Sequence, residues 1–260
     1  QRLVWRQYQD FVLAGAKLDA RHKARLAELN QELATLYTEF AQNVLHDEEN
    51  YMVVLESEAD LAGLPDSIRA GAAAAAEERG HAGKWVITNT RSSVEPFLTF
   101  SSRRDLRENV WRQFVDRGDN GGPHDNNGVI SRILKRRAER AKLLGYPTHA
   151  HWALQDSMAK TPEATVQLME AVWAPAVKRV REELAAMQAL ADREAQPIRI
   201  APWDYRFYAE QVRKAKYDID QNEMKPYLQL DKLREGMFWV AGELFGFSFV
   251  PVVGLPVFHP

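Results

Sequence analysis

The sequence has no cysteine among its 260 residues, which excludes disulfides, thiolate nucleophiles and sulfur-ligated zinc sites. It has no apolar run near the roughly 18 residues that a membrane helix needs, so we expect no membrane partner. The sequence also has no large excess of positive or negative charge. It contains 34 Lys and Arg and 36 Asp and Glu, which gives a net charge of −2. That balance gives no general attraction for nucleic acid. With 45% hydrophobic and 27% charged residues, the composition is typical of a globular chain of one or two domains.

The common catalytic motifs are missing as well. The sequence contains no GxSxG, no GxxxxGK[ST] or GxGxxG, and no HExxH, so it shows neither a serine nucleophile, a phosphate loop nor a zinc-peptidase helix. His46 precedes three acidic residues, but no second histidine follows four positions later, and we expect a solvated helix end there. His149 and His151 stand at a helix start, where side chains two residues apart diverge by about 200°, which favours capping and surface roles. The full histidine set is His22, His46, His81, His124, His149, His151 and His259.

Apolar side chains recur at helical spacing over most of the chain. The pattern predicts helices over about 18–45, 66–80, 104–115, 127–144, 161–193, 204–216 and 232–244. Thr161-Pro162-Glu163 is a strong start signal: a capping Thr, Pro at the first helical position and Glu at the positive end of the helix dipole. Residues 51–55, 85–90 and 97–100 favour strands, the last two as a hairpin, and together a small sheet. We therefore expect a mainly α fold with a small antiparallel β element.

Three local features could carry function. The loop 118–128 (GDNGGPHDNNG) has the composition of a mobile surface turn. The helix after it presents a basic face that could bind an acidic partner or RNA. The same helix also carries an apolar stripe, so these bases are more simply explained as its solvent-exposed face. We therefore expect no nucleic-acid partner. Aromatic side chains at 203–208 could form a stacking platform, although core packing is more common. The basic face comprises Arg132, Lys135, Arg136, Arg137, Arg140 and Lys142.

Several long segments resemble the zinc peptidase family of thimet oligopeptidase, neurolysin, oligopeptidase A and bacterial peptidyl-dipeptidase. The segments appear in the family's order and spacing, and MAKTPEA and PWDYRFYAEQVRKAKYDID are most similar to the peptidyl-dipeptidase branch, also called dipeptidyl carboxypeptidase. Residues 1–102 resemble the family more loosely. The other similar segments are DLRENVWRQFVDRG, DNNGVISRILKRRAERAKLLGYPTHAHW, EMKPYLQLDKLREGMFWVAGELFGFSF and LPVFHP.

The resemblance implies part of a two-lobed, helical, neurolysin-like metallopeptidase fold. It implies a helical segment with a small sheet over 1–102 and the first helical portion of the peptidase domain over 103–260. The family hydrolyses short peptides with a zinc-bound water and a Glu general base, and the branch releases C-terminal dipeptides. The HExxH helix would follow the apolar, strand-like stretch 250–260, so we expect a fragment whose continuation lies beyond Pro260 and carries the zinc.

No catalytic or metal-binding residue can therefore be assigned within the chain, and its substrate-binding residues are unknown. Trp203, Tyr205 and Tyr208 are conceivable channel-wall residues only. We expect the chain alone to bind no zinc and to be inactive, with the remainder of its own peptidase domain as partner and short peptides as the parent's substrates. A cytoplasmic location is expected because no signal sequence is visible. The alternative is a non-catalytic helical scaffold or binding protein, and the coding sequence past Pro260 would separate the two.

Overall fold

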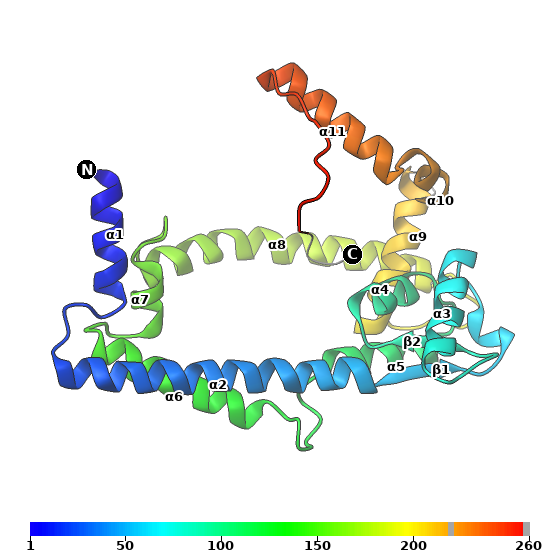
Figure 1. Cartoon of the computed structure of the whole chain (residues 1–260). Coiled ribbons are helices and arrows are strands. Elements are labelled where there is room, and N and C mark those ends of the chain that lie inside the picture. The colour runs from blue at the N-terminus through cyan, green and yellow to red at the C-terminus, as the bar shows by residue number, and fades with distance from the viewer. Residues whose placement is uncertain (218–220, 257–260) are drawn as a thin grey trace. The chain divides into compact units, whose positions relative to one another are not determined.

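The computed structural model describes residues 1–217 and 221–256 and is mainly α-helical (Figure 1). It divides into two compact units, Gln1–Glu210 and Gln211–Pro260, which are described separately. The helices and strands of the first unit are α1 (Arg2–Leu13), α2 (Ala20–Asn50), β1 (Met52–Leu55), α3 (Asp66–Glu78), β2 (Trp85–Thr88), α4 (Arg91–Phe100), α5 (Arg104–Val115), α6 (Asn127–Leu143), α7 (His149–Leu154) and α8 (Pro162–Ala191). α9 (Tyr205–Tyr217) crosses the boundary, and α10 (Gln221–Met224) and α11 (Leu230–Phe245) follow.

The first hydrophobic core forms around a two-stranded sheet. β1 and β2 pair antiparallel, with Met52 opposite Thr88 and Leu55 opposite Trp85. Short β-branched runs such as MVVL and WVIT suit a pleated surface that is buried on one side. Helices α3, α4 and α5 and the segment 58–64 between β1 and α3 supply the rest of the core. Its buried members are Val53, Leu55, Leu61, Leu64, Ala72, Ile87, Val94, Phe97, Leu98 and Val110.

The second core joins α2 to α6, which run alongside each other in Figure 1. Leu33 and Leu36 of α2 pack against Val129 and Ile133 of α6. The predicted apolar stripes of both helices therefore meet, and each begins near its predicted residue: Asp19 caps α2 by accepting a hydrogen bond from the His22 N–H, and α6 begins at Asn127.

The helix predicted to begin at Thr161-Pro162-Glu163 is confirmed as α8. The Thr161 hydroxyl accepts a hydrogen bond from the Ala164 N–H at 3.2 Å, and Pro162 occupies the first helical position. A proline there loses nothing, because the N–H it lacks would have no intrahelical acceptor.

The C-terminal unit has no buried side chain on its principal helix. α11 ends at Gly246, which adopts a left-handed conformation (φ +69°) and donates its N–H to the Gly242 carbonyl at 2.8 Å. The rings of Phe238 and Phe249 stack with centroids 4.2 Å apart, which folds the following segment back along the helix.

The predicted mainly α fold with a small antiparallel sheet is confirmed, but its predicted strand content was partly wrong. Residues 97–100 belong to α4 and not to a hairpin, because Val94, Phe97 and Leu98 follow helical spacing and all three are buried in the first core. Pro96 lies inside that helix, which made the segment look extended. No strand is recorded over 247–256, and the end of the predicted strand-like stretch, 257–260, lies outside the described residues.

Within 1–217 and 221–256, no helix combines the length and the hydropathy that crossing a bilayer requires.

Candidate functional site

The histidines of the described residues do not form a metal-binding cluster. His22 contacts the carboxylate of the capping Asp19, with its Nδ1 2.8 Å from each oxygen, and His81 lies in the turn after α3. Across the described ranges 1–217 and 221–256 there is no group of three or more His, Asp or Glu side chains that could hold a metal ion, and His259 lies outside them. The donor set in these ranges therefore does not fit a zinc ion.

Two histidines that are far apart in sequence do meet. The rings of His46, in the last turns of α2, and His124, in the loop before α6, stack with centroids 3.6 Å apart and an interplanar angle of 16°. His46 is part-exposed, as expected at a helix end, but its stacking partner could not be foreseen. The sequence carries no periodic signal that would bring a loop histidine to this position.

The loop 118–128 is fastened to α2 and is not a free turn. The carboxylate of Asp47, which is 2% exposed, accepts hydrogen bonds from the Gly118 N–H at 2.7 Å and from the Asn120 Nδ2 at 2.8 Å. At the other end of the loop, Asn43 donates its Nδ2 to the Asn126 Oδ1 at 2.9 Å. These contacts replace water for buried polar groups, so the loop is held at both ends.

Part of the basic face of α6 pairs with acidic side chains of α2. Arg132 donates to Glu39 at 2.6 Å, and Arg136 forms an ion pair with Glu32. Arg25 of α2 reaches across to Glu139 of α6, at 2.7 Å from its Nη2. Two of the six bases are therefore part of an interhelical charge network, while Arg137 and Arg140 contact the neutral side chains of Tyr37 and Asn30.

His149 and His151 have different surroundings. Thr148 caps α7, and its hydroxyl accepts from the His151 N–H at 3.3 Å and lies 2.8 Å from the His151 Nδ1. His151 thus has the expected role near a helix cap. His149 is half-buried instead, and its Nδ1 is buried without a hydrogen-bond partner.

The aromatic residues Trp203, Tyr205 and Tyr208 do not share one surface. Tyr208 is 1% exposed, its hydroxyl donates to Glu194 at 2.8 Å, and burial together with that carboxylate raises its pKa to about 12. Trp203 is half-buried, with the guanidinium carbons of Arg104 and Arg112 at 5.6 and 5.2 Å from its ring centroid. Only Tyr205 is exposed. Core packing therefore describes this cluster better than a stacking platform.

A buried ion cluster beneath these aromatics was missed from the sequence. Asp204, with no exposed surface, accepts from Arg104 Nη2 at 2.9 Å and from Arg107 Nη2 at 2.8 Å. Arg107, which is 2% exposed, also donates to the Ser101 carbonyl at 2.7 Å and lies 4.2 Å from the Phe207 ring centroid. A signal existed: Arg104, Arg107 and Val110 are three residues apart and share one helix face, so Arg107 lies on the face that turns toward the core.

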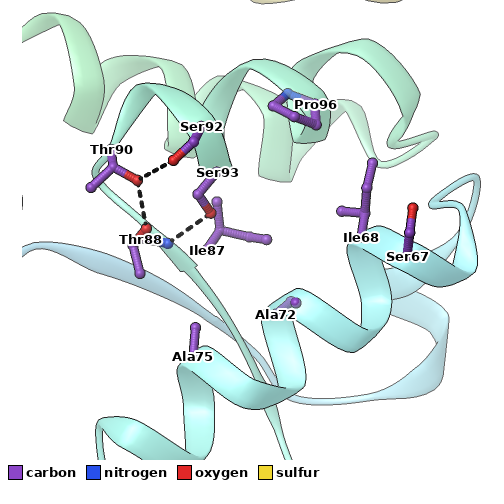
Figure 2. Close-up of a pocket in the computed structure, with 11 residues that line it drawn as sticks. Ser67, Ile68, Ala72, Ala75, Ile87, Thr88, Thr90, Ser92, Ser93 and Pro96 are labelled. Atoms are coloured by element: carbon purple, nitrogen blue, oxygen red, sulfur yellow. Dashed lines mark hydrogen bonds between the residues drawn. The ribbon is translucent and has the colours of Figure 1, made fainter. Parts of the chain in front are cut away.

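A surface pocket of about 290 Å³ lies between α3, β2 and α4 (Figure 2). One wall consists of hydroxyls that already bond to one another or to the backbone: Thr88 Oγ1 lies 2.9 Å from Thr90 Oγ1, and the Thr88 N–H donates to Ser93 Oγ at 3.1 Å. None of the lining residues is charged, so the pocket offers neither metal ligands nor an acid–base group that titrates near neutrality. They are Ser67, Ile68, Gly71, Ala72, Ala75, Ile87, Thr88, Thr90, Ser92, Ser93 and Pro96.

Comparison with known proteins identifies the family. The sequence matches the family model described as Peptidase family M3 over residues 97–260. It is 41% identical over its whole length to dipeptidyl carboxypeptidase of Escherichia coli (strain K12), covering 38% of that protein. It is 34% identical to a probable cytosolic oligopeptidase A of Arabidopsis thaliana, with 100% of the chain and 38% of the relative covered.

Oligopeptidase A of Escherichia coli (strain K12) is 30% identical, with 97% of the chain and 38% of the relative covered. The chain thus spans well under half the length of each of these relatives. Because the family match extends over more than half of the chain, the chain belongs to peptidase family M3.

Proposed function

We propose that the chain forms part of a zinc-dependent peptidyl-dipeptidase that hydrolyses short peptides and releases C-terminal dipeptides. The observation that carries this proposal is the gradient of identity, 41% to a dipeptidyl carboxypeptidase against 34% and 30% to oligopeptidases A. The alignment with the dipeptidyl carboxypeptidase covers all 260 residues, so the similarity reflects more than one shared motif. A dipeptide-releasing specificity is therefore favoured over general oligopeptidase activity.

The residues of this chain support a structural role in such an enzyme. Zinc would supply Lewis-acid activation of water in the parent, but the described donor set does not fit that ion. We therefore assign no catalytic step to this chain and propose that it is inactive alone. Its division into a preceding segment, 1–102, and a first portion of the peptidase domain, 103–260, remains part of this proposal.

The exposed face of α8 supports the remainder of the same domain as partner. Apolar side chains recur every three or four residues along this helix, and the last two, Met187 and Ala191, are buried in the first unit. Apart from the half-buried Val177, the rest of the stripe faces solvent, although large apolar stripes of this kind normally mark an interface. Its exposed members are Val166, Met169, Trp173, Val180 and Leu184.

α11 shows the same property within the C-terminal unit. Leu233, Met237 and Leu244 are all more than half exposed, and they follow the four- and seven-residue spacing of a helix that packs on another element. A peptidase domain that contains further helices would bury both faces.

The test compares the full-length parent with this chain on one set of peptides. We expect the parent to release C-terminal dipeptides, detected by mass spectrometry, to lose this activity with a chelator and to regain it with zinc, while the chain alone releases none. Peptides with an amidated C-terminus serve as control, since a peptidyl-dipeptidase distinguishes them from free acids. Cleavage inside long peptides without dipeptide release would contradict the dipeptidase assignment. Zinc-dependent release by the chain alone would contradict its inactivity, and a parent without any peptidase activity would favour the scaffold alternative.

We also propose a cytoplasmic location for the parent. One relative is named a probable cytosolic oligopeptidase A and another an organellar, chloroplastic/mitochondrial one, so the relatives differ in compartment. Fractionation of cells that express the tagged parent would test the proposal, and recovery in an organelle or outside the cell would contradict it.

A further inference from the structure

Three basic side chains lie where α6 packs against α2 and α7. Arg140 and His149 both lie against Trp152 of α7, with the guanidinium carbon 4.5 Å and the imidazole centroid 5.5 Å from its ring centroid. Arg137 and Arg140 are three residues apart on α6 and therefore share a face, and His149 is the first residue of α7. Their neighbours on α6 have acidic partners, Arg132 with Glu39 and Arg136 with Glu32. For Arg137, Arg140 and His149, in contrast, no ion pair with any carboxylate exists in the part of the chain that the structure describes.

The contacts that these arginines do make are with neutral groups. Arg137 donates its Nε to the Tyr37 hydroxyl at 2.8 Å, and Arg140 donates its Nη1 to the Asn30 Oδ1 at 3.3 Å while its guanidinium carbon lies 4.5 Å from the Trp152 ring centroid. A cation over an aromatic ring is stabilised by the ring, but the ring does not neutralise its charge. These hydrogen bonds use the Nε of Arg137 and the Nη1 of Arg140. The N–H groups on both Nη atoms of Arg137 and on the Nη2 of Arg140 are not used in them.

Two polar atoms of the same side chains have no partner. Arg140 Nε and His149 Nδ1 are both buried and make no hydrogen bond, and a buried polar group without a partner is destabilising. Desolvation and then the charges of Arg137 and Arg140 lower the pKa of His149. Burial also lowers the pKa of Arg140. The cluster is therefore electropositive, partly desolvated and without a counter-charge.

From this geometry we infer that Arg137, Arg140 and His149 form a binding site for a small oxyanion of the carboxylate or sulfate type. Guanidinium groups match such anions in shape and charge, because their parallel N–H groups reach two oxygens together. A bound anion would supply the missing negative charge and favour the protonated form of His149. By linkage, its affinity must rise as His149 takes up a proton. This inference stands independently of the proposed peptidase function.

The test is an NMR titration of the whole chain with sodium sulfate and, separately, sodium acetate, against sodium chloride at equal ionic strength. We expect the ring signals of His149 to shift saturably with the oxyanion and its pKa to rise, with affinity at least a few-fold tighter at pH 5.5 than at pH 7.5. Saturation with both anions supports a general oxyanion site, and saturation with acetate alone narrows it to carboxylates.

Arg137→Gln removes one charge of the site and should weaken binding about tenfold. Arg132→Gln is the matched control, because it removes a charge from the same helix that pairs with Glu39, and it should leave binding unchanged. Equal weakening by both variants would mean diffuse surface charge, and shifts no larger than those with chloride would mean a simple ionic-strength effect. Either result overturns the inference. If Arg137→Gln does not fold, the titration of the wild-type chain alone decides whether the oxyanion site exists.

Discussion

At the scale of single residues, we expect a small change at Asp204 to lower the free energy of unfolding substantially. It has no exposed surface and forms ion pairs with two arginines, of which Arg107 is itself 2% exposed. Asp204→Asn leaves that guanidinium buried without its counter-charge, so we expect a loss of about 3–5 kcal/mol in the free energy of unfolding, measured by urea denaturation.

Asp105→Asn is the control for this prediction. Asp105 pairs with Arg103 on the surface, with both side chains substantially exposed, and such pairs contribute at most about 1 kcal/mol. Equal losses in the two variants would show that the buried cluster is not coupled as the structure indicates.

Tyr208 should ionise later than an ordinary tyrosine, because burial and the Glu194 carboxylate raise its pKa to about 12. An acid that is harder to ionise in the native state than in the unfolded state contributes stability below its ordinary pKa of about 10, and this contribution is lost as the pH rises toward 12. Absorbance titration at 295 nm should show a late step that Tyr208→Phe removes and Tyr205→Phe retains. A late step that survives Tyr208→Phe would refute the assignment.

His149 gives the opposite dependence on pH. Its pKa is lowered in the folded protein, so the unfolded chain binds the proton more readily, and folding stability should decrease as the pH falls below the ordinary value near 6.5. His149→Asn should flatten this part of the stability profile in chloride buffer. His22→Asn, at an exposed helix start, should leave the His149 contribution in place. An unchanged slope in His149→Asn would contradict the prediction.

At the scale of elements, the loop 118–128 depends on a glycine. Gly118 has φ +73°, and a Cβ there would lie 2.8 Å from the Asn126 Nδ2, a side chain held in place by the Phe40 carbonyl. Gly118→Ala should therefore cost about 1–3 kcal/mol in thermal or urea unfolding. Gly122→Ala, in the same loop, meets no atom within 4 Å and should be nearly neutral. If both are neutral, the loop is not fastened to α2 as described.

The long helices could be predicted from the sequence because each carries its own periodic signal, whereas α1 (Arg2–Leu13) was not predicted. α5 has the predicted bounds, and α6 and α8 begin at the predicted residues. The failure at 97–100 has a local cause, since Pro96 and the aromatic residues suggested a strand, whereas burial of Val94, Phe97 and Leu98 on one face decided for the helix. Pairing between elements gives no local signal. The stacking of His46 on His124 and the Arg107–Asp204 ion pair join residues about 80–100 positions apart, which no spacing rule could anticipate.

At the scale of the whole molecule, the α8 stripe should matter only when its partner is present. Trp173 is 72% exposed, so Trp173→Asp should change the unfolding free energy of this chain by less than about 0.5 kcal/mol. In the full-length parent the same change should cost about 3–5 kcal/mol, as for loss of a buried aromatic. Both effects are measured by denaturant unfolding.

Lys178→Asp is the control on the opposite face of α8 and should be small in both proteins. Equal effects of Trp173→Asp in the chain and in the parent would mean that the stripe stays exposed in the enzyme. This would remove the structural support for the remainder of the domain as partner.

The Asp204 cluster also bears on how the protein is made. Arg107 and Asp204 are 97 residues apart, so at roughly 5–20 residues per second a ribosome needs about 5–20 s to synthesise the carboxylate after the guanidinium. Until then the Arg107 guanidinium must remain hydrated, and the face of α5 that later becomes buried must remain exposed to solvent. The nascent N-terminal half can form its sheet and helices in that interval. It can bury this face of α5 only after the segment that begins at Ala201 has been synthesised.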